Sequence, residues 1–301
     1  MATKGRRFGF IGFLGAIGGL FLGALLAQAA PIRVIASTPG LVELVQVVGG
    51  PDVMIQGVLQ AGQDPHSLSP RLQPGSRGQW KDTVLVVRNG LGLEDAWLGP
   101  LQAAQAEPGL RKNGDRDFDA SRSASLLAPP EGGPRLGENH PSSNPHFLLD
   151  PRNGIRVAEA LEKALSQIDP AHSAGYAERF RQFKKKREAQ IQAWLGRLKS
   201  WSGKVAVTDH AHLTYLWAWL GVSAQATLEL APGHPPTPAH LEKLVQEMKK
   251  RQVKVFFFES GRPESLVRVM ARRTHAKALA VDPSGRESQW EPLIETLAKA
   301  P

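Results

Sequence analysis

The chain has no cysteine among its 301 residues. This absence excludes a disulfide framework and any metal site built from thiolates. It also excludes a lipid attached to a cysteine at the start of a mature exported chain. Metal or catalytic chemistry in this protein must therefore come from side chains other than cysteine.

Sequence signatures of common hydrolases and nucleotide-binding enzymes are missing as well. There is no His-Glu-x-x-His helix, no Gly-x-Ser-x-Gly elbow and no glycine-rich loop that could cradle phosphates. The enzyme alternative is a zinc hydrolase with Glu259 or Asp209 as its base, and nothing in the sequence resembles its motifs. We therefore expect a protein that is not an enzyme.

The excess of positive charge is small. The formal net charge is +9, and three of these charges lie in residues 1–30, which leaves +6 for the remainder. Two basic runs, at residues 184–187 and 249–251, lie on segments with helical spacing of apolar residues and have no exposed aromatic residues between the charges. They are typical of solvated helix faces, so we expect no nucleic-acid partner.

The first thirty residues differ from the rest of the chain. Lys4, Arg6 and Arg7 precede an apolar, glycine-rich run over residues 8–26, and the small-x-small pattern of a cleavage site ends at Ala29. We expect an export signal over residues 1–29, cleaved near Ala29, and a periplasmic mature protein. A retained membrane anchor is the alternative, because the apolar run is close to the length that spans a bilayer. Export could use the Sec or the twin-arginine route.

Buried strands alternate with amphipathic helices along the remainder of the chain, which is typical of α/β proteins with mainly parallel sheets. We expect two α/β lobes, each with such a sheet flanked by helices, joined by one long linking helix. The predicted boundaries are 30–168 for the N-terminal lobe, 169–200 for the linking helix and 201–301 for the C-terminal lobe. Less regular stretches predict a helix through Trp97 and Leu101 and a short strand within 118–127.

Four candidate metal ligands each follow a strand or a proline that fixes the backbone. They are His66, His146, His210 and Asp282. Each is expected in a loop at the carboxyl edge of a sheet, where ligands of α/β proteins collect. Three imidazoles and one carboxylate form a full tetrahedral set for Zn²⁺. A closed set leaves no position for an activated water, so the ion would be carried rather than used in catalysis.

Further polar residues are expected near these ligands. Asp64 and Asp150 flank ligand histidines and could fix their tautomers, with helix capping as the alternative for Asp150. Glu259 ends a predicted strand, where it could reach the cleft or remain a loop acid. His212 is a second choice to His210 as the third ligand.

The same segments give the chain a resemblance to a known family. It resembles the zinc- and manganese-type periplasmic solute-binding proteins of bacterial ABC importers, of the zinc-uptake branch, over essentially the whole mature chain. The segments occur in the family's order: GQDPHSLSP at 62–70, NGLGLE at 89–94, NPHFLLDP at 144–151, VTDH at 207–210, PTPAHL at 236–241 and VDP at 281–283. Where the family commonly has an acid after His210, this chain has Ala211, followed by His212.

The resemblance implies two lobes with a metal in the cleft between them, and it assigns the ligand roles to His66, His146, His210 and Asp282. It also implies a function: capture of Zn²⁺ and delivery to a membrane permease driven by a cytoplasmic ATPase. We expect a monomer. Mn²⁺ or Fe²⁺ is the alternative cargo. Adhesion, or zinc delivery without a permease, is the alternative role. Because metal ligands must be deprotonated, affinity should fall as the pH drops through the histidine range.

Overall fold

The computed structural model describes residue 1 and residues 29–63, 65–66, 80–128, 143–222, 224–229, 236–260 and 264–300. Nearly all of the predicted export signal, and also Asp64, lie outside these residues. No helix within the described ranges is both long enough and apolar enough to cross a membrane.

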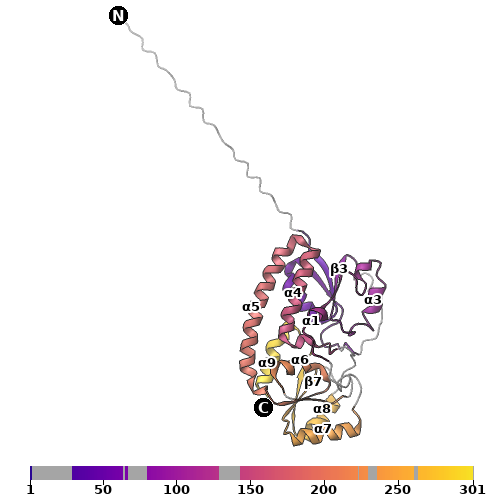
Figure 1. The fold of residues 1–301 in the computed structure, drawn as a ribbon, viewed down its shortest axis with the longest axis vertical. Coiled ribbons are helices and arrows are strands. Elements are labelled where there is room, and N and C mark those ends of the chain that lie inside the picture. Colours follow the sequence, from indigo (N-terminus) through magenta and orange to yellow (C-terminus); the bar gives the residue numbers. More distant parts are fainter. Residues whose placement is uncertain are drawn as a thin grey trace.

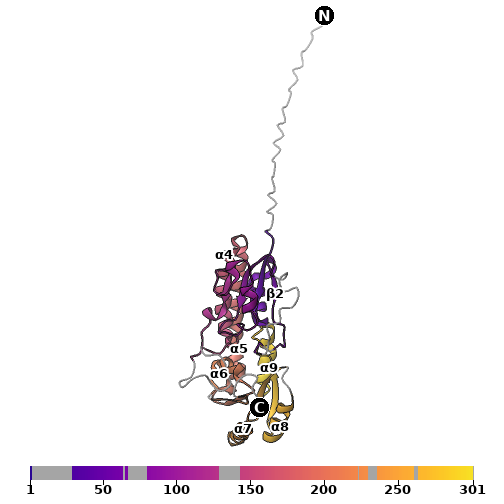
Figure 2. The same ribbon diagram turned by 90° about the vertical axis from the view of Figure 1, so that its right-hand side faces the viewer.

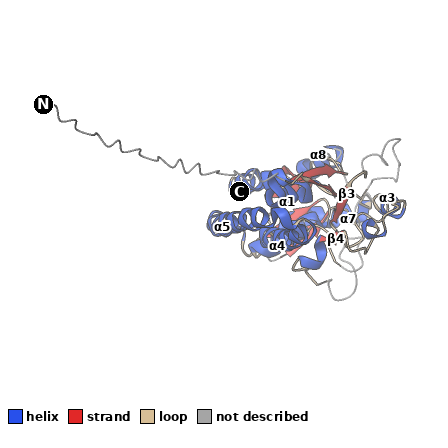
Figure 3. Cartoon of the chain, turned by 90° about the horizontal axis from the view of Figure 1, so that it is seen from above, coloured by secondary structure: helices blue, strands red, loops and turns tan. Residues whose placement is uncertain are grey.

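The N-terminal lobe contains a four-stranded sheet with strand order β2-β1-β3-β4, in which all neighbours are parallel. In this lobe β3 lies between the α1/α4 side and the shorter α3 (Figure 1, Figure 3). The strands are β1 (Ile32–Ala36), β2 (Val53–Gly57), β3 (Thr83–Arg88) and β4 (Asp117–Asp119). The helices of this part of the chain are α1 (Pro39–Gly49), α3 (Gly99–Ala103) and α4 (Pro151–Ile168).

The C-terminal lobe repeats this plan, with strand order β6-β5-β7-β8 and only parallel neighbours. Its strands are β5 (Val205–Thr208), β6 (Ala224–Thr227), β7 (Val255–Glu259) and β8 (Lys277–Val281). Its helices are α6 (Thr214–Leu220), α7 (Pro238–Lys250), α8 (Glu264–Thr274) and α9 (Trp290–Ala298). Helix α7 begins as expected, because the Thr237 side chain accepts a hydrogen bond from the His240 backbone N–H and Pro238 fills the first turn. The predicted two-lobed α/β fold is confirmed.

One long helix, α5 (Ser173–Leu198), runs beside both lobes (Figure 1, Figure 2). Its buried residues Phe183, Ile191, Trp194 and Leu198 recur at helical spacing and form one stripe, and most charged residues of the helix lie on the other faces. This stripe belongs to a single apolar core that includes residues of both sheets. A shared, closely packed core resists separation of the lobes, because packed interiors deform little.

The last helix ties the C-terminus to α5. The indole rings of Trp194 and Trp290 stack with centroids 5.3 Å apart, and Trp194 Nε1 donates a hydrogen bond to Glu291 Oε1 at 2.8 Å. At the end of the linking helix, Trp201 Nε1 donates to the Leu297 carbonyl at 3.1 Å. Aromatic rings that bury large areas and satisfy their N–H groups stabilise such a junction.

The segment between β8 and α9 lies close against the N-terminal lobe. A Cβ added to Gly40 of α1 would lie 2.3 Å from the Ser284 carbonyl oxygen, so only glycine permits this approach. Gly285 has φ +66° and packs on Leu148, which also requires glycine. Nearby, Ser288 donates two hydrogen bonds to the Glu43 carboxylate, through its backbone N–H at 2.8 Å and its hydroxyl at 2.7 Å.

Three local predictions differ from the structure. Residues 91–98 form turns, and only Gly99–Ala103 is helical where a helix through Trp97 and Leu101 was expected, since Gly99 and Pro100 suit a helix start. Where a strand was expected within 118–127, β4 ends at Asp119 and residues 120–123 form a 3-10 helix. In the basic run at 184–187 the three lysines are exposed as expected, but Arg187 is buried, because it lies on the same face of α5 as Phe183 and Trp194.

Candidate metal centre

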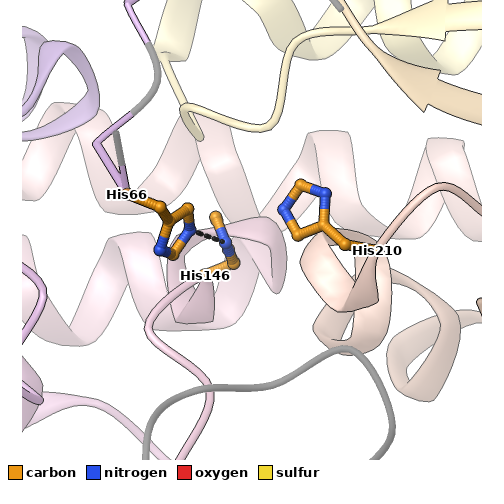
Figure 4. A group of neighbouring side chains, drawn as sticks. All are labelled: His66, His146 and His210. Atoms are coloured by element: carbon orange, nitrogen blue, oxygen red, sulfur yellow. Dashed lines mark hydrogen bonds between the residues drawn. The ribbon is translucent and has the colours of Figure 1, made fainter. Parts of the chain in front are cut away.

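Three imidazoles from distant parts of the sequence converge at the junction of the lobes. His66 follows β2, His146 precedes a short 3-10 helix (Phe147–Leu149) ahead of α4, and His210 follows β5. Figure 4 shows the three rings pointing toward one another. Their ring centroids lie 5.4 Å (His66 to His146), 5.8 Å (His66 to His210) and 5.7 Å (His146 to His210) apart.

The spacing of the ring nitrogens is that of ligands around one ion. His66 Nε2 and His146 Nε2 lie 3.3 Å apart. Two nitrogens bound to one tetrahedral Zn²⁺ at about 2.0–2.1 Å would be roughly 3.3–3.4 Å apart. One ligand atom from each of the three histidines lies within 4.8 Å of the others. The three histidines can therefore bind a metal ion with little rearrangement.

Hydrogen bonds to the backbone hold the loops that carry these histidines. Asn144 Oδ1 accepts from the His146 backbone N–H at 2.8 Å, and Asn144 Nδ2 donates to the Ala211 carbonyl at 2.7 Å. This one amide thus joins the loops of His146 and His210. On the other side, Trp97 Nε1 donates to the Pro65 carbonyl at 3.1 Å, next to His66.

His212 does not belong to this trio. Its Nδ1 lies 3.0 Å from Asp209 Oδ1, and its ring centroid is 4.5 Å from that of His210. Burial by itself would raise the pKa of Asp209, but the neighbouring rings of His212 and His210 outweigh it and hold the pKa well below its ordinary value. Asp209 Oδ1 also lies 3.4 Å from His210 Nδ1, and it accepts the His210 backbone N–H at 2.8 Å. Asp209 is thus an anchored carboxylate that orients both rings.

The predicted fourth ligand, Asp282, follows β8 but is not part of the histidine trio. It lines a cavity of about 390 Å³, together with His146, Glu259 and Arg286. Glu259 ends β7, is buried, and has Oε2 3.9 Å from His210 Nε2. Of the two possibilities left open for Glu259, the structure places it in the cleft. Both carboxylates thus border the space beside the histidines.

Asp150 is a helix cap. Its side chain accepts a hydrogen bond from the Arg152 backbone N–H at 2.9 Å at the start of α4. It also accepts from the Arg152 guanidinium, at 2.7 Å from Nη2. These contacts match the capping alternative.

Comparisons with known proteins agree with this architecture. Residues 34–299 match the family described as zinc-uptake complex component A, periplasmic, or ZnuA. The match covers most of the chain. The chain belongs to the ZnuA family.

Relatives of this ZnuA-family chain differ in the metal that they are named for. It is 24% identical over 246 residues to the zinc-binding lipoprotein AdcA of Streptococcus pneumoniae, covering 80% of this chain and 48% of AdcA. It is 22% identical over 278 residues to the manganese ABC transporter substrate-binding lipoprotein PsaA of the same species, covering 87% of this chain and 86% of PsaA.

A crystal structure of ZnuA shares the fold. Its TM-score is 0.77 at 20% sequence identity, and the match covers 90% of this chain and 99% of that chain. The family comprises metal-binding substrate-binding proteins of ABC transporters, not enzymes. Its members are periplasmic proteins or exported lipoproteins.

A buried glutamate, Glu94, supports the loop of His146 through Asn89. Glu94 accepts hydrogen bonds from the Ser37 hydroxyl at 2.7 Å and from the backbone N–H groups of Asn89 and Gly90. Asn89 Nδ2 in turn donates to the Pro145 carbonyl at 2.9 Å. The sequence contained this glutamate within its motif, but its role depends on contacts that span more than fifty residues. Burial raises the pKa of Glu94 to about 7, although the three hydrogen bonds act against the rise.

This pKa predicts a specific pH dependence of stability. The unfolded chain releases the Glu94 proton near 4.5, whereas the folded chain keeps it to about 7. The free energy of unfolding of the metal-free protein should therefore fall as the pH rises between these values, by about 3 kcal/mol. Glu94→Gln should remove this fall, because an amide does not titrate. Urea unfolding of both proteins from pH 4 to pH 8 measures the difference, and parallel profiles would contradict the prediction.

Proposed function

We propose that this protein captures Zn²⁺ between its lobes and delivers it to an ABC importer permease that is driven by a cytoplasmic ATPase. The convergence of His66, His146 and His210, with a nitrogen separation of 3.3 Å, carries the proposal. Imidazole nitrogen suits zinc, and Asp282 is proposed as the fourth ligand. In this proposal residues 1–29 are the export signal, cleaved near Ala29. The lobes comprise 30–168 and 201–301, and the helix between them 169–200.

Manganese is the second candidate cargo, and one observation favours it. Asp282 and Glu259 both line the cavity beside the histidines, and carboxylate oxygens suit manganese better than zinc. The three imidazoles outnumber the two carboxylates, of which Glu259 lies 3.9 Å from His210 Nε2, and this favours zinc. We therefore propose zinc as the first choice of cargo and manganese as the second.

Metal analysis tests the proposal directly. Protein produced without an affinity tag and incubated with zinc is expected to retain one zinc ion per chain after gel filtration, measured by plasma mass spectrometry. Competition with a chromophoric chelator should show tighter binding of Zn²⁺ than of Mn²⁺, because the trio supplies nitrogen ligands. Failure to retain an ion would refute metal capture, and tighter binding of Mn²⁺ would refute the choice of cargo.

A further inference from the structure

The Asp282 carboxylate is already bound by a cation of the protein itself. Arg286 Nη2 donates to Asp282 Oδ2 at 2.6 Å and Nε donates to the same oxygen at 3.2 Å. The other oxygen, Oδ1, accepts the Ser284 backbone N–H at 2.9 Å. A carboxylate has about four acceptor positions, so these three donors occupy most of them. Metal binding by Asp282 therefore competes with the guanidinium contact for the remaining acceptor positions.

Charge acts in the same direction as geometry. A guanidinium remains positive at every pH at which the protein is folded. Its positive charge offsets the negative charge of Asp282. It also repels a divalent cation at that carboxylate, since the interaction of like charges a few ångströms apart is unfavourable. Arg286 lies four residues beyond Asp282, so the chain itself keeps the two groups together.

The cavity beside Arg286 has space for a second position of its side chain. Asp282 and Arg286 both line the cavity of about 390 Å³ between the lobes, and Gln289 and Ser260 line it too. The side chain of Asp282 is 21% exposed and that of Arg286 is 22% exposed. An arginine that is partly exposed beside such a space can rotate away from Asp282 without opening the core.

We propose that Arg286 competes with the metal for Asp282, and that this competition lowers the affinity of the site and speeds release of the ion. The proposal rests on the proposed function, because it assumes a metal at the histidine trio. In the metal-free protein Arg286 neutralises Asp282. When the ion binds, Asp282 turns from the guanidinium to the metal. When the ion leaves, Arg286 takes the carboxylate back, which keeps a carrier from holding its cargo too tightly.

Replacing Arg286 with glutamine tests this competition. Arg286→Gln is expected to bind Zn²⁺ up to about fivefold more tightly, since a partly exposed ion pair contributes up to roughly a factor of five. The gain in affinity should come mainly from slower dissociation of zinc. Stopped-flow transfer of zinc to a chelator measures that rate. Arg286→Lys keeps the charge but loses the two-pronged contact, so its affinity should lie between those of the other two proteins.

Two further variants separate competition from other causes. Arg251→Gln breaks a similar pair, in which Arg251 Nε lies 3.2 Å from Glu247 Oε2 on α7, and it should leave zinc affinity unchanged. In an Asp282→Asn background, Arg286→Gln should give a much smaller gain, because the carboxylate for which it competes is gone. Circular dichroism and the thermal midpoint of the metal-free proteins confirm that each variant is folded.

The outcomes distinguish this inference from the proposed function. Unchanged or weaker zinc binding by Arg286→Gln would overturn the competition, the weaker case meaning that Arg286 instead supports the ligand. An undiminished gain in the Asp282→Asn background would overturn it too. If the wild-type protein binds no zinc, the proposed function itself fails.

Discussion

Replacing His146 with alanine is expected to weaken zinc binding by at least about 10²-fold. Its Nε2 lies 3.3 Å from that of His66, and its ring centroid lies 5.7 Å from that of His210, so its ring is close to both other members of the trio. Structural zinc sites contribute roughly 10–16 kcal/mol from four ligands, so one ligand supplies about 3 kcal/mol, or somewhat over two powers of ten. Competition with a chelator of known affinity measures the loss.

A matched control removes a histidine outside the trio. His240 lies on α7 and its Nε2 contacts the Thr227 carbonyl oxygen at 2.9 Å, so His240→Ala removes an imidazole from the same lobe as His210. This variant should keep the wild-type affinity for zinc. Far-ultraviolet circular dichroism should be the same for both variants. Full-strength zinc binding by His146→Ala would exclude His146 as a ligand and, with it, the proposed site.

The sequence was sufficient to predict the part of the site that backbone topology determines. In parallel sheets the carboxyl ends of strands meet at one edge, so residues directly after strands come together whatever their separation along the chain. His66 and His210 follow strands, and Pro145 restricts the backbone before His146. The two lobes with mainly parallel sheets followed from the same alternation of strands and helices, and this predicted architecture was confirmed.

The contacts that individual side chains form could not be predicted in the same way. Whether Asp282 faces the histidines or Arg286 depends on a rotamer and on a partner only four residues away, and sequence spacing permits both. Arg187 shows the same limit. Its basic neighbours indicated a solvated helix face, but its angular position on α5 places it inside, and its counterion, Glu287, lies a hundred residues away.

Arg187 lies in the junction between α5 and the C-terminal segment. It is 3% exposed, and its guanidinium carbon lies 5.2 Å from the ring centroids of Phe183 and Trp194 and 5.6 Å from that of Trp290. Its Nη2 is paired with Glu287 Oε2. Burial lowers the pKa of Arg187 and raises that of Glu287, while each charge opposes the shift in its partner. The two groups are therefore tolerated here only as a pair.

Breaking this pair is expected to cost about 3–5 kcal/mol of folding stability, because it leaves a buried charge without its partner. Glu287→Ala should accordingly lower the thermal midpoint of the metal-free protein by about 10 °C. The double variant Arg187→Met/Glu287→Leu removes both charges and keeps apolar volume among the rings, so it should recover most of that loss. Differential scanning calorimetry of the wild-type protein and of both variants measures these shifts.

A single variant as stable as the wild type would show that Glu287 does not compensate the charge of Arg187. A double variant no more stable than Glu287→Ala would show that the loss comes from packing rather than from the unpaired charge.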